Sequence, residues 1–172
     1  MLATRSELLA VLDELGIVTT TTGHAPVFTV DESRLLRGRI PGAHSKNLFV
    51  KDRKDALFLI VALEDAALDL KRIHVAIGAS GRVSFGKPDL LMATLGVPPG
   101  SVTPFAVIND TERRVSVVID RDLIAHERMN FHPLENTATT TIGRDDLVRF
   151  LEAVGHPPRI LPLAPDIAPD AG

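Results

Sequence analysis

The chain has 172 residues, 45% of them hydrophobic and 24% charged, which suits one soluble domain around a single core. It contains no cysteine, which excludes disulfides, thiolate metal sites and a cysteine nucleophile. Its formal net charge is -3 and its seven aromatic residues are all Phe, so neither non-specific coating of nucleic acid nor an extended base-stacking surface is expected.

The chain also lacks the marks of a membrane or secreted protein. No apolar run approaches the roughly 20 residues that a membrane-spanning helix needs. The first 15 residues alternate charged and apolar groups at helical spacing, which is not typical of a signal peptide. We therefore expect a cytoplasmic protein with a single domain over residues 1–163. Three prolines in the last eleven residues predict that residues 164–172 form a flexible tail.

The N-terminal half begins with a predicted helix. Thr4 and Glu7 have the spacing of a capping box, Leu8 and Leu12 lie on one helical face, and Gly16 follows the last turn. Beyond it, β-branched and apolar runs predict strands, and two polar segments predict short helices. The expected strands are 17–22, 27–30, 47–51 and 57–63, and the expected short helices are 31–36 and 69–73.

The C-terminal half is expected to contain more strands than helices. Pro88 suits the first turn of a helix over 88–95, closed by Gly96, and a last amphipathic helix is expected over 145–154. The expected strands are 82–85, 105–108, 115–120, 128–131, 137–142 and 160–163, the second and third forming a hairpin around 109–112. Short connections between neighbouring strands favour an α+β fold with a mixed, mainly antiparallel, curved sheet.

Positive charge is concentrated in residues 34–54, which contain seven cations and a single acid, Asp52. The local balance is +6, which leaves -9 for the rest of the chain. This segment is either a solvated face or a small basic platform that engages a few phosphates. The cations are Arg34, Arg37, Arg39, Lys46, Lys51, Arg53 and Lys54.

Several familiar catalytic motifs are missing. The sequence has neither a GxGxxG fingerprint nor a Walker phosphate loop. The nearest match to a serine-hydrolase elbow, at residues 78–82, ends in Arg82 instead of glycine. His126 and Glu127 begin a zincin-like pattern, but Asn130 occupies the position of the second histidine. We therefore expect no metal and a hydrolytic site without a strong protein nucleophile.

Two segments carry residues suited to such a site. Lys46 is either an ordinary surface lysine or a point charge at a pocket rim, since Asn47 and an apolar strand follow it. His44 is either its partner or a turn residue. Residues 100–104 are either a simple loop or a turn, fixed by Gly100 and Pro104, whose amides orient a carbonyl and stabilise an oxyanion.

A third segment follows near the C-terminus. Pro133 holds His132 in extended geometry, and the ring either lines a pocket or is a hydrogen-bonded core histidine. The threonine run at 137–141 reflects either β-propensity or a row of hydroxyls facing that pocket.

Six segments together resemble one protein family. They are residues 24–30 (HAPVFTV), 36–38 (LRG), 42–49 (GAHSKNLF), 100–105 (GSVTPF), 130–133 (NFHP) and 136–140 (NTATT). In this order and spacing the chain resembles the free-standing prolyl-tRNA editing proteins of the YbaK and aminoacyl-tRNA synthetase-associated domain superfamily. The resemblance extends over about residues 5–162.

This resemblance implies a mixed, barrel-like sheet flanked by helices and an aminoacyl-tRNA deacylase that acts without metal or other cofactor. The implied reaction is hydrolysis in trans of mischarged tRNA(Pro), above all alanyl-tRNA(Pro). The implied partners are the tRNA acceptor end and prolyl-tRNA synthetase, with neither membrane nor DNA. The alternatives are a deacylase for mischarged cysteine or serine and a non-catalytic nucleic-acid-binding module.

The resemblance also implies roles for individual residues. Lys46 would hold the terminal nucleotide, the loop from Gly100 to Pro104 would position the ester carbonyl, and His132 would shape the amino-acid pocket. The tRNA ribose hydroxyl and a water would supply the reacting oxygens. The implied catalytic residues are Lys46, Gly100 and Pro104. The implied substrate-binding residues are His44, Asn47, Ser101, Val102, Thr103, His132 and Thr137. The implied tRNA-binding residues are Arg37, Arg39, Lys51, Arg53 and Lys54.

Overall fold

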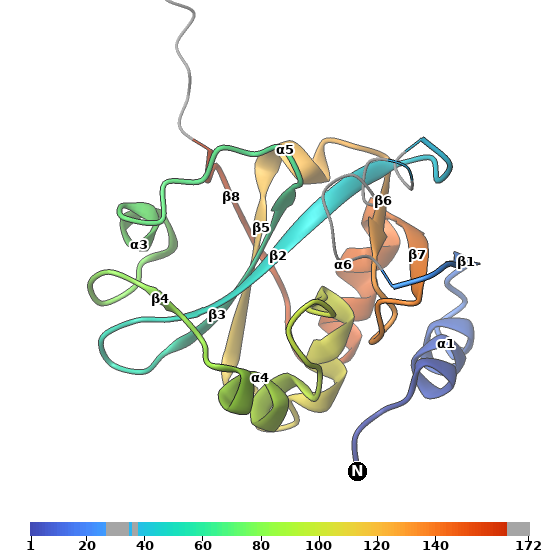
Figure 1. Cartoon of the computed structure of the whole chain (residues 1–172), viewed down its shortest axis with the longest axis horizontal. Helices are drawn as coiled ribbons and strands as arrows, with labels where there is room; N and C mark the ends of the chain where they lie inside the picture. Colours follow the sequence, from blue (N-terminus) through green and yellow to red (C-terminus); the bar gives the residue numbers. More distant parts are fainter. Residues whose placement is uncertain (27–34, 36–37, 165–172) are drawn as a thin grey trace, which may run out of the picture.

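The computed structural model describes residues 1–26, 35 and 38–164, and its centre is one eight-stranded sheet (Figure 1). The strands are β1 (Thr20–Gly23), β2 (Ala43–Lys51), β3 (Leu57–Leu63), β4 (Ser84–Phe85), β5 (Val115–Asp120), β6 (Arg128–Phe131), β7 (Ala138–Gly143) and β8 (Arg159–Leu161). The helices are α1 (Arg5–Glu14), α3 (Ile73–Ile77), α4 (Pro88–Leu95), the 3-10 helix η1 (Pro104–Asn109), α5 (Arg121–Ile124) and α6 (Arg144–Ala153).

The sheet is mixed, and this confirms the expected α+β class. Its strand order is β1-β7-β6-β2-β3-β5-β8, with β4 paired to β2 outside this path. Pairs β1–β7, β2–β3, β2–β4 and β6–β7 are antiparallel, whereas β2–β6, β3–β5 and β5–β8 are parallel. Helix α1 lies near β1 at one end of the molecule and α3 lies at the other (Figure 1).

Strand β3 is the centre of the hydrophobic core. Leu57, Leu59 and Val61 pack into a cluster that also contains residues of α1, α4, η1 and α6. Phe58 and Ile60 point to the opposite face and join a second cluster with residues of α3. Because both faces of β3 are covered, its sequence is a continuous apolar run instead of an alternating one.

The two best-defined helix predictions are confirmed. Thr4 Oγ1 accepts a hydrogen bond from the Glu7 amide at 3.2 Å, and Leu8 and Leu12 of α1 are buried. Helix α4 begins at Pro88 and ends at Gly96, which has the positive φ of 68° that favours glycine.

The expected strand at 105–108, with its hairpin around 109–112, is wrong. This segment is the 3-10 helix η1, in which Pro104 occupies the first turn and Thr103 Oγ1 accepts a hydrogen bond from the Phe105 amide at 3.3 Å. Four consecutive residues from Pro104 to Val107 are buried, and periodicity cannot distinguish strand from helix in a short run that is apolar throughout.

Two smaller corrections concern helices. The helix expected at 69–73 begins only at Ile73, because the Asp69 carboxylate accepts a hydrogen bond from the Lys71 amide at 3.0 Å and forms a turn there. Helix α5 was not predicted.

Three predictions concern segments outside the described residues. They are the strand 27–30, the helix 31–36 apart from residue 35, and most of the tail. In the described part of the chain, no helix is long and apolar enough to span a bilayer.

Candidate active site

A cavity of about 260 Å³ lies where three distant parts of the chain meet. One wall is the first half of β2 with Glu64, the second is the loop before η1, and the third is the end of β6 with β7. The lining residues are His44, Ser45, Lys46, Asn47, Glu64, Gly100, Val102, Asn130, Phe131, His132 and Thr139. Lys46, Gly100 and His132, which sequence reasoning placed together, all contribute to this one cavity.

The cavity lies beside the point where β2 and β6 separate. These parallel strands pair only at Ala43 and His44, opposite Met129 and Asn130. One residue later the ladder is replaced by a side-chain bond, in which Ser45 Oγ donates to the Asn130 carbonyl at 2.8 Å. Beyond this point β2 continues with β3, so the diverging strands leave space between them.

Asn130 lies at the point where β2 and β6 separate. It is buried, its Nδ2 donates to the Pro41 carbonyl at 3.1 Å, and its Oδ1 accepts from Thr141 Oγ1 at 2.5 Å. Gly42 fits here because it has a φ of 104° and because a Cβ atom would approach Asn130 Nδ2 to 3.1 Å. Backbone conformation and packing therefore favour glycine at position 42 of this motif.

Lys46 is half-buried and lines the cavity, which contradicts its interpretation as an ordinary surface lysine. Its Nζ donates a hydrogen bond to the Ala66 carbonyl in the turn after β3. His44, also half-buried on β2, uses Nε2 to contact the Ile40 carbonyl at 3.1 Å. Asn47 donates to Ser45 Oγ at 3.3 Å. These contacts hold three predicted site residues along one strand edge.

Some residues of the loop before η1 line the cavity, and others are buried in the core. Gly100 and Val102 line the cavity, whereas Ser101, Thr103 and Pro104 are buried and are not among its lining residues. The Ser101 amide donates to the Pro98 carbonyl at 3.1 Å. The structure thus places the predicted catalytic Pro104 at the start of η1, behind the cavity wall, where it fixes the loop.

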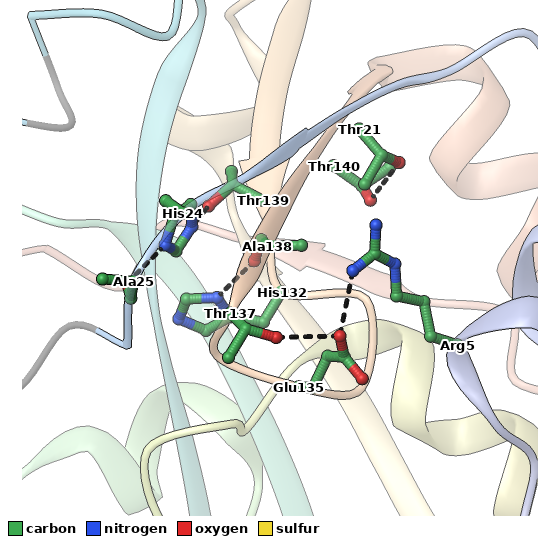
Figure 2. Close-up of polar contacts among 10 residues, drawn as sticks. All are labelled: Arg5, Thr21, His24, Ala25, His132, Glu135, Thr137, Ala138, Thr139 and Thr140. Carbon is green, nitrogen blue, oxygen red and sulfur yellow. Dashed lines mark hydrogen bonds and ion pairs between the residues drawn. The ribbon is translucent and has the colours of Figure 1, made fainter.

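His132 is half-buried, with one nitrogen satisfied by the protein. Its Nδ1 lies 3.1 Å from the Ala138 carbonyl (Figure 2), and the ring lines the cavity. Burial lowers the pKa of His132, the Ala138 carbonyl opposes this shift, and the nearby His24 adds to it. The ring is therefore a neutral cavity residue at pH 7.

The threonine run does not face the cavity as a whole. Thr139 lines the cavity and Thr137 does not. Thr137 Oγ1 instead donates to Glu135 Oε1 at 2.8 Å, and Glu135 also accepts from Arg5 of α1 at 2.9 Å (Figure 2). The Arg5 guanidinium, followed by the Thr137 hydroxyl, lowers the pKa of Glu135. This group ties the loop between His132 and β7 to α1.

The predicted tRNA-binding cations lie away from the cavity. Lys51, Arg53 and Lys54 occupy the end of β2 and the β2–β3 turn, and Lys51 Nζ lies 3.5 Å from Asp55 Oδ1. A strand advances about 3.4 Å per residue, so Lys51 lies about 17 Å along β2 from Lys46. Arg39 is exposed before β2, and Arg37 lies outside the described residues.

Five cavity residues were missing from the predicted site: Ser45, Glu64, Asn130, Phe131 and Thr139. Ser45, Asn130 and Phe131 stand inside recognised motifs, and Thr139 follows Thr137 at the two-residue period of a strand, so local signals existed for these four. Glu64 carried no such signal. Within the described residues, no three His, Asp or Glu side chains form a group that could hold a metal ion.

Comparison with known proteins assigns the family. The aminoacyl-tRNA editing domain model matches residues 24–150. The "Prolyl-tRNA synthetase associated domain-containing protein 1" of Danio rerio is 40% identical over 91% of this chain and 86% of its own length. The "Prolyl-tRNA editing protein ProX" of Acetoanaerobium sticklandii is 35% identical over 88% of this chain and 93% of its own.

A solved structure supports the fold. It is described as a candidate trans-editing enzyme for prolyl-tRNA synthetase and has a TM-score of 0.67 at 16% identity, covering 94% of this chain and 99% of that one. The predicted class of enzyme, an aminoacyl-tRNA deacylase, agrees with these relatives. The chain is a member of the aminoacyl-tRNA editing domain family.

Proposed function

We propose that this protein hydrolyses alanyl-tRNA(Pro) in trans, at the cavity between Lys46, Gly100 and His132. The observation that carries the proposal is the convergence of these three residues, from β2, the loop before η1 and the end of β6, on one small space. The relative from Acetoanaerobium sticklandii is named for prolyl-tRNA editing, which supports the same class of substrate.

The cavity is small. Its volume of about 260 Å³ lies below the roughly 300–1,000 Å³ of pockets that hold drug-sized ligands. A synthetase pocket built for proline excludes the smaller alanine weakly, because missing methylenes give only about 1–3 kcal/mol of discrimination. A second site that accepts alanine and excludes proline by size would restore fidelity.

The proposed chemistry needs no protein nucleophile. A water oxygen attacks the ester carbonyl carbon, the bond from that carbon to the ribose oxygen breaks, and the ribose oxygen takes up a proton. Free alanine and uncharged tRNA result. Water and the tRNA ribose hydroxyl supply the reacting oxygens, which agrees with the absence of cysteine and of a serine-hydrolase elbow from the sequence.

Each wall of the cavity would then have one task. The Lys46 ammonium holds a phosphate or ribose oxygen of the terminal adenosine, since it is a flexible point charge at the cavity. Backbone amides near Gly100 orient the ester carbonyl and stabilise the developing oxyanion. The His132 ring limits the space beside the amino-acid side chain. Pro104 contributes by fixing the loop.

The rest of the tRNA would meet the cations of the β2–β3 turn. Lys51, Arg53 and Lys54 lie far enough from Lys46 to contact the acceptor stem while the terminal adenosine occupies the cavity. A transient complex with prolyl-tRNA synthetase and a cytoplasmic location, where tRNA is charged, belong to the same proposal. Arg37 and Arg39 extend the predicted tRNA contact toward the segment before β2.

A deacylation assay tests the proposal. Purified protein is incubated with alanyl-, cysteinyl-, seryl- and prolyl-tRNA(Pro), with and without EDTA. We expect alanyl-tRNA(Pro) to be hydrolysed fastest, prolyl-tRNA(Pro) to be spared and EDTA to have no effect. Faster hydrolysis of the cysteinyl or seryl ester would reassign the substrate. Binding of tRNA(Pro) without any hydrolysis would instead favour a non-catalytic RNA-binding module.

A further inference from the structure

We propose that His24 is a positioning residue of this cavity: it accepts a hydrogen bond from the Thr139 hydroxyl, so that Thr139 and His132 together offer hydrogen-bond acceptors to the α-ammonium of the aminoacyl group. The inference rests on the proposed function. It adds a residue to which neither the sequence prediction nor the cavity lining gives a role.

His24 lies directly behind the cavity wall, just after the end of β1. Its Nε2 is 2.8 Å from Thr139 Oγ1, and its ring centroid is 6.5 Å from that of His132 (Figure 2). Thr139 and His132 line the cavity, whereas His24 is not among the lining residues. Any effect of His24 on a ligand must therefore pass through these two neighbours.

The second nitrogen of His24 fixes the direction of its bond to Thr139. His24 Nδ1 lies 2.8 Å from the Ala25 carbonyl, which can only accept a hydrogen bond. Nδ1 must carry the proton, and in the neutral ring Nε2 is then an acceptor. With the ring neutral, the Thr139 hydroxyl donates to His24, and both lone pairs of its oxygen are available to a ligand in the cavity.

The same reasoning applies to His132. Its Nδ1 faces the Ala138 carbonyl at 3.1 Å and must be the protonated nitrogen. Burial lowers the pKa of His132, which keeps the ring neutral. Its Nε2 thus has a free lone pair, and no hydrogen bond to another of the described residues occupies it. Thr139 and His132 both present acceptors from neighbouring positions on the same wall.

An aminoacyl ester brings one cationic donor to such a wall. Its α-ammonium carries three N–H groups, whereas the ester carbonyl and the phosphates can only accept. Lys46, on the opposite strand, suits those acceptors instead. The two sides of the cavity would therefore differ in charge. Lys46 places a cation beside the nucleotide, and Thr139 and His132 place neutral acceptors beside the amino group. Among the described lining residues, Glu64 carries the carboxylate that would compete for the ammonium.

The experiment compares two substrates that differ only at this group. Wild-type protein and variants are assayed with alanyl-tRNA(Pro) and with lactyl-tRNA(Pro), in which a hydroxyl replaces the α-ammonium. The readout is the ratio of the two kcat/KM values. We expect wild type to prefer the alanyl ester, and His24→Leu to lower this preference about tenfold, because a hydrogen bond to a charged group is lost. Most of the loss should be a rise in KM for the alanyl ester.

Three further variants separate positioning from structure. His24→Gln, whose amide can accept a hydrogen bond near the position of Nε2, should restore most of the preference. Thr139→Val, which keeps the shape of threonine, should lower the preference as His24→Leu does. The double variant should be no worse than Thr139→Val alone, because both changes break the same contact. His126→Leu, at an exposed histidine, is the matched control and should behave as wild type.

Several results would overturn the inference. One is an unchanged preference in His24→Leu and Thr139→Val. Another is a double variant whose losses multiply. A third is a preference abolished by Glu64→Gln while His24→Leu retains it, which would make Glu64 the ammonium receptor. A wild-type protein that hydrolyses neither ester would overturn the proposed function itself, whereas the other three results leave that function standing.

Discussion

Lys46 is the only lysine among the residues that line the described cavity. We predict that Lys46→Ala lowers kcat/KM for alanyl-tRNA(Pro) by about 100-fold, the size of effect seen when one oriented electrostatic contact to a reacting group is removed. The melting temperature should change little, since Lys46 contributes one hydrogen bond to the Ala66 carbonyl. Lys71→Ala, at an exposed lysine before α3, is the control. Near-wild-type turnover in Lys46→Ala would remove this residue from the site.

In the proposed function, His132 limits the space available to the amino acid. We predict that His132→Ala lowers the preference for alanyl- over prolyl-tRNA(Pro) by about tenfold, because the enlarged cavity accepts the proline ring. The measurement is the ratio of kcat/KM for the two esters, together with Tm. Unaltered selectivity with a large fall in Tm would show that the ring is a core histidine and does not select the substrate.

The β2–β3 turn carries two of the cations proposed to bind tRNA, Arg53 and Lys54. The Asp52 carboxylate accepts hydrogen bonds from the amides of Ser80 at 2.8 Å, Ala56 at 2.9 Å and Lys54 at 2.9 Å. These bonds, that of Ser80 first, lower the pKa of Asp52. The carboxylate thereby fixes the turn that carries Arg53 and Lys54.

We predict that Arg53→Ala and Lys54→Ala each weaken tRNA binding and each reduce the slope of log K against log[salt] by about 1, the amount expected for one phosphate contact. Hydrolysis of 3′-alanyl-adenosine, which lacks the stem, should be unaffected. Arg114→Ala, at an exposed arginine before β5, serves as the control. A slope identical to wild type in both turn variants would place the tRNA body elsewhere.

A buried contact between His156 and Asp110 joins the segment after α6 to the segment before β5. His156 Nε2 lies 2.9 Å from Asp110 Oδ2, with side chains 1% and 3% exposed, and the same carboxylate oxygen accepts from the Val115 amide at 2.8 Å. We predict that His156→Ala lowers the free energy of unfolding by about 3 kcal/mol, because a buried carboxylate loses its partner. Urea denaturation measures this, with His126→Ala as the exposed control. A change below about 0.5 kcal/mol, typical of surface positions, would contradict it.

At the scale of the whole molecule, the sequence predicted elements whose signals are local. Strand β3 is a continuous apolar run, and α4 has both a proline start and a glycine end. Helix η1 was mistaken for a strand because its apolar residues are buried on every side and leave no period to read. Propensity alone did not reveal α5, which has four residues.

The site residues that could be predicted from the sequence also had local signals. Lys46, Gly100 and His132 could be grouped because each belongs to a motif with its own spacing. Glu64 could not, because its place depends on the pairing of β2 with β3 and on the separation of β2 from β6. Such long-range pairings are set by the tertiary fold. For the same reason the sequence did not show which members of the Gly100–Pro104 loop face the cavity and which support it from behind.

The most direct test of the central claim is a crystal structure with 3′-alanylamino-adenosine, an amide that mimics the ester but resists hydrolysis. We predict that its alanyl group occupies the cavity between Lys46, Gly100 and His132, with the adenosine nearest Lys46. An analogue bound outside this cavity, or a prolyl analogue seated in it equally well, would contradict the claim.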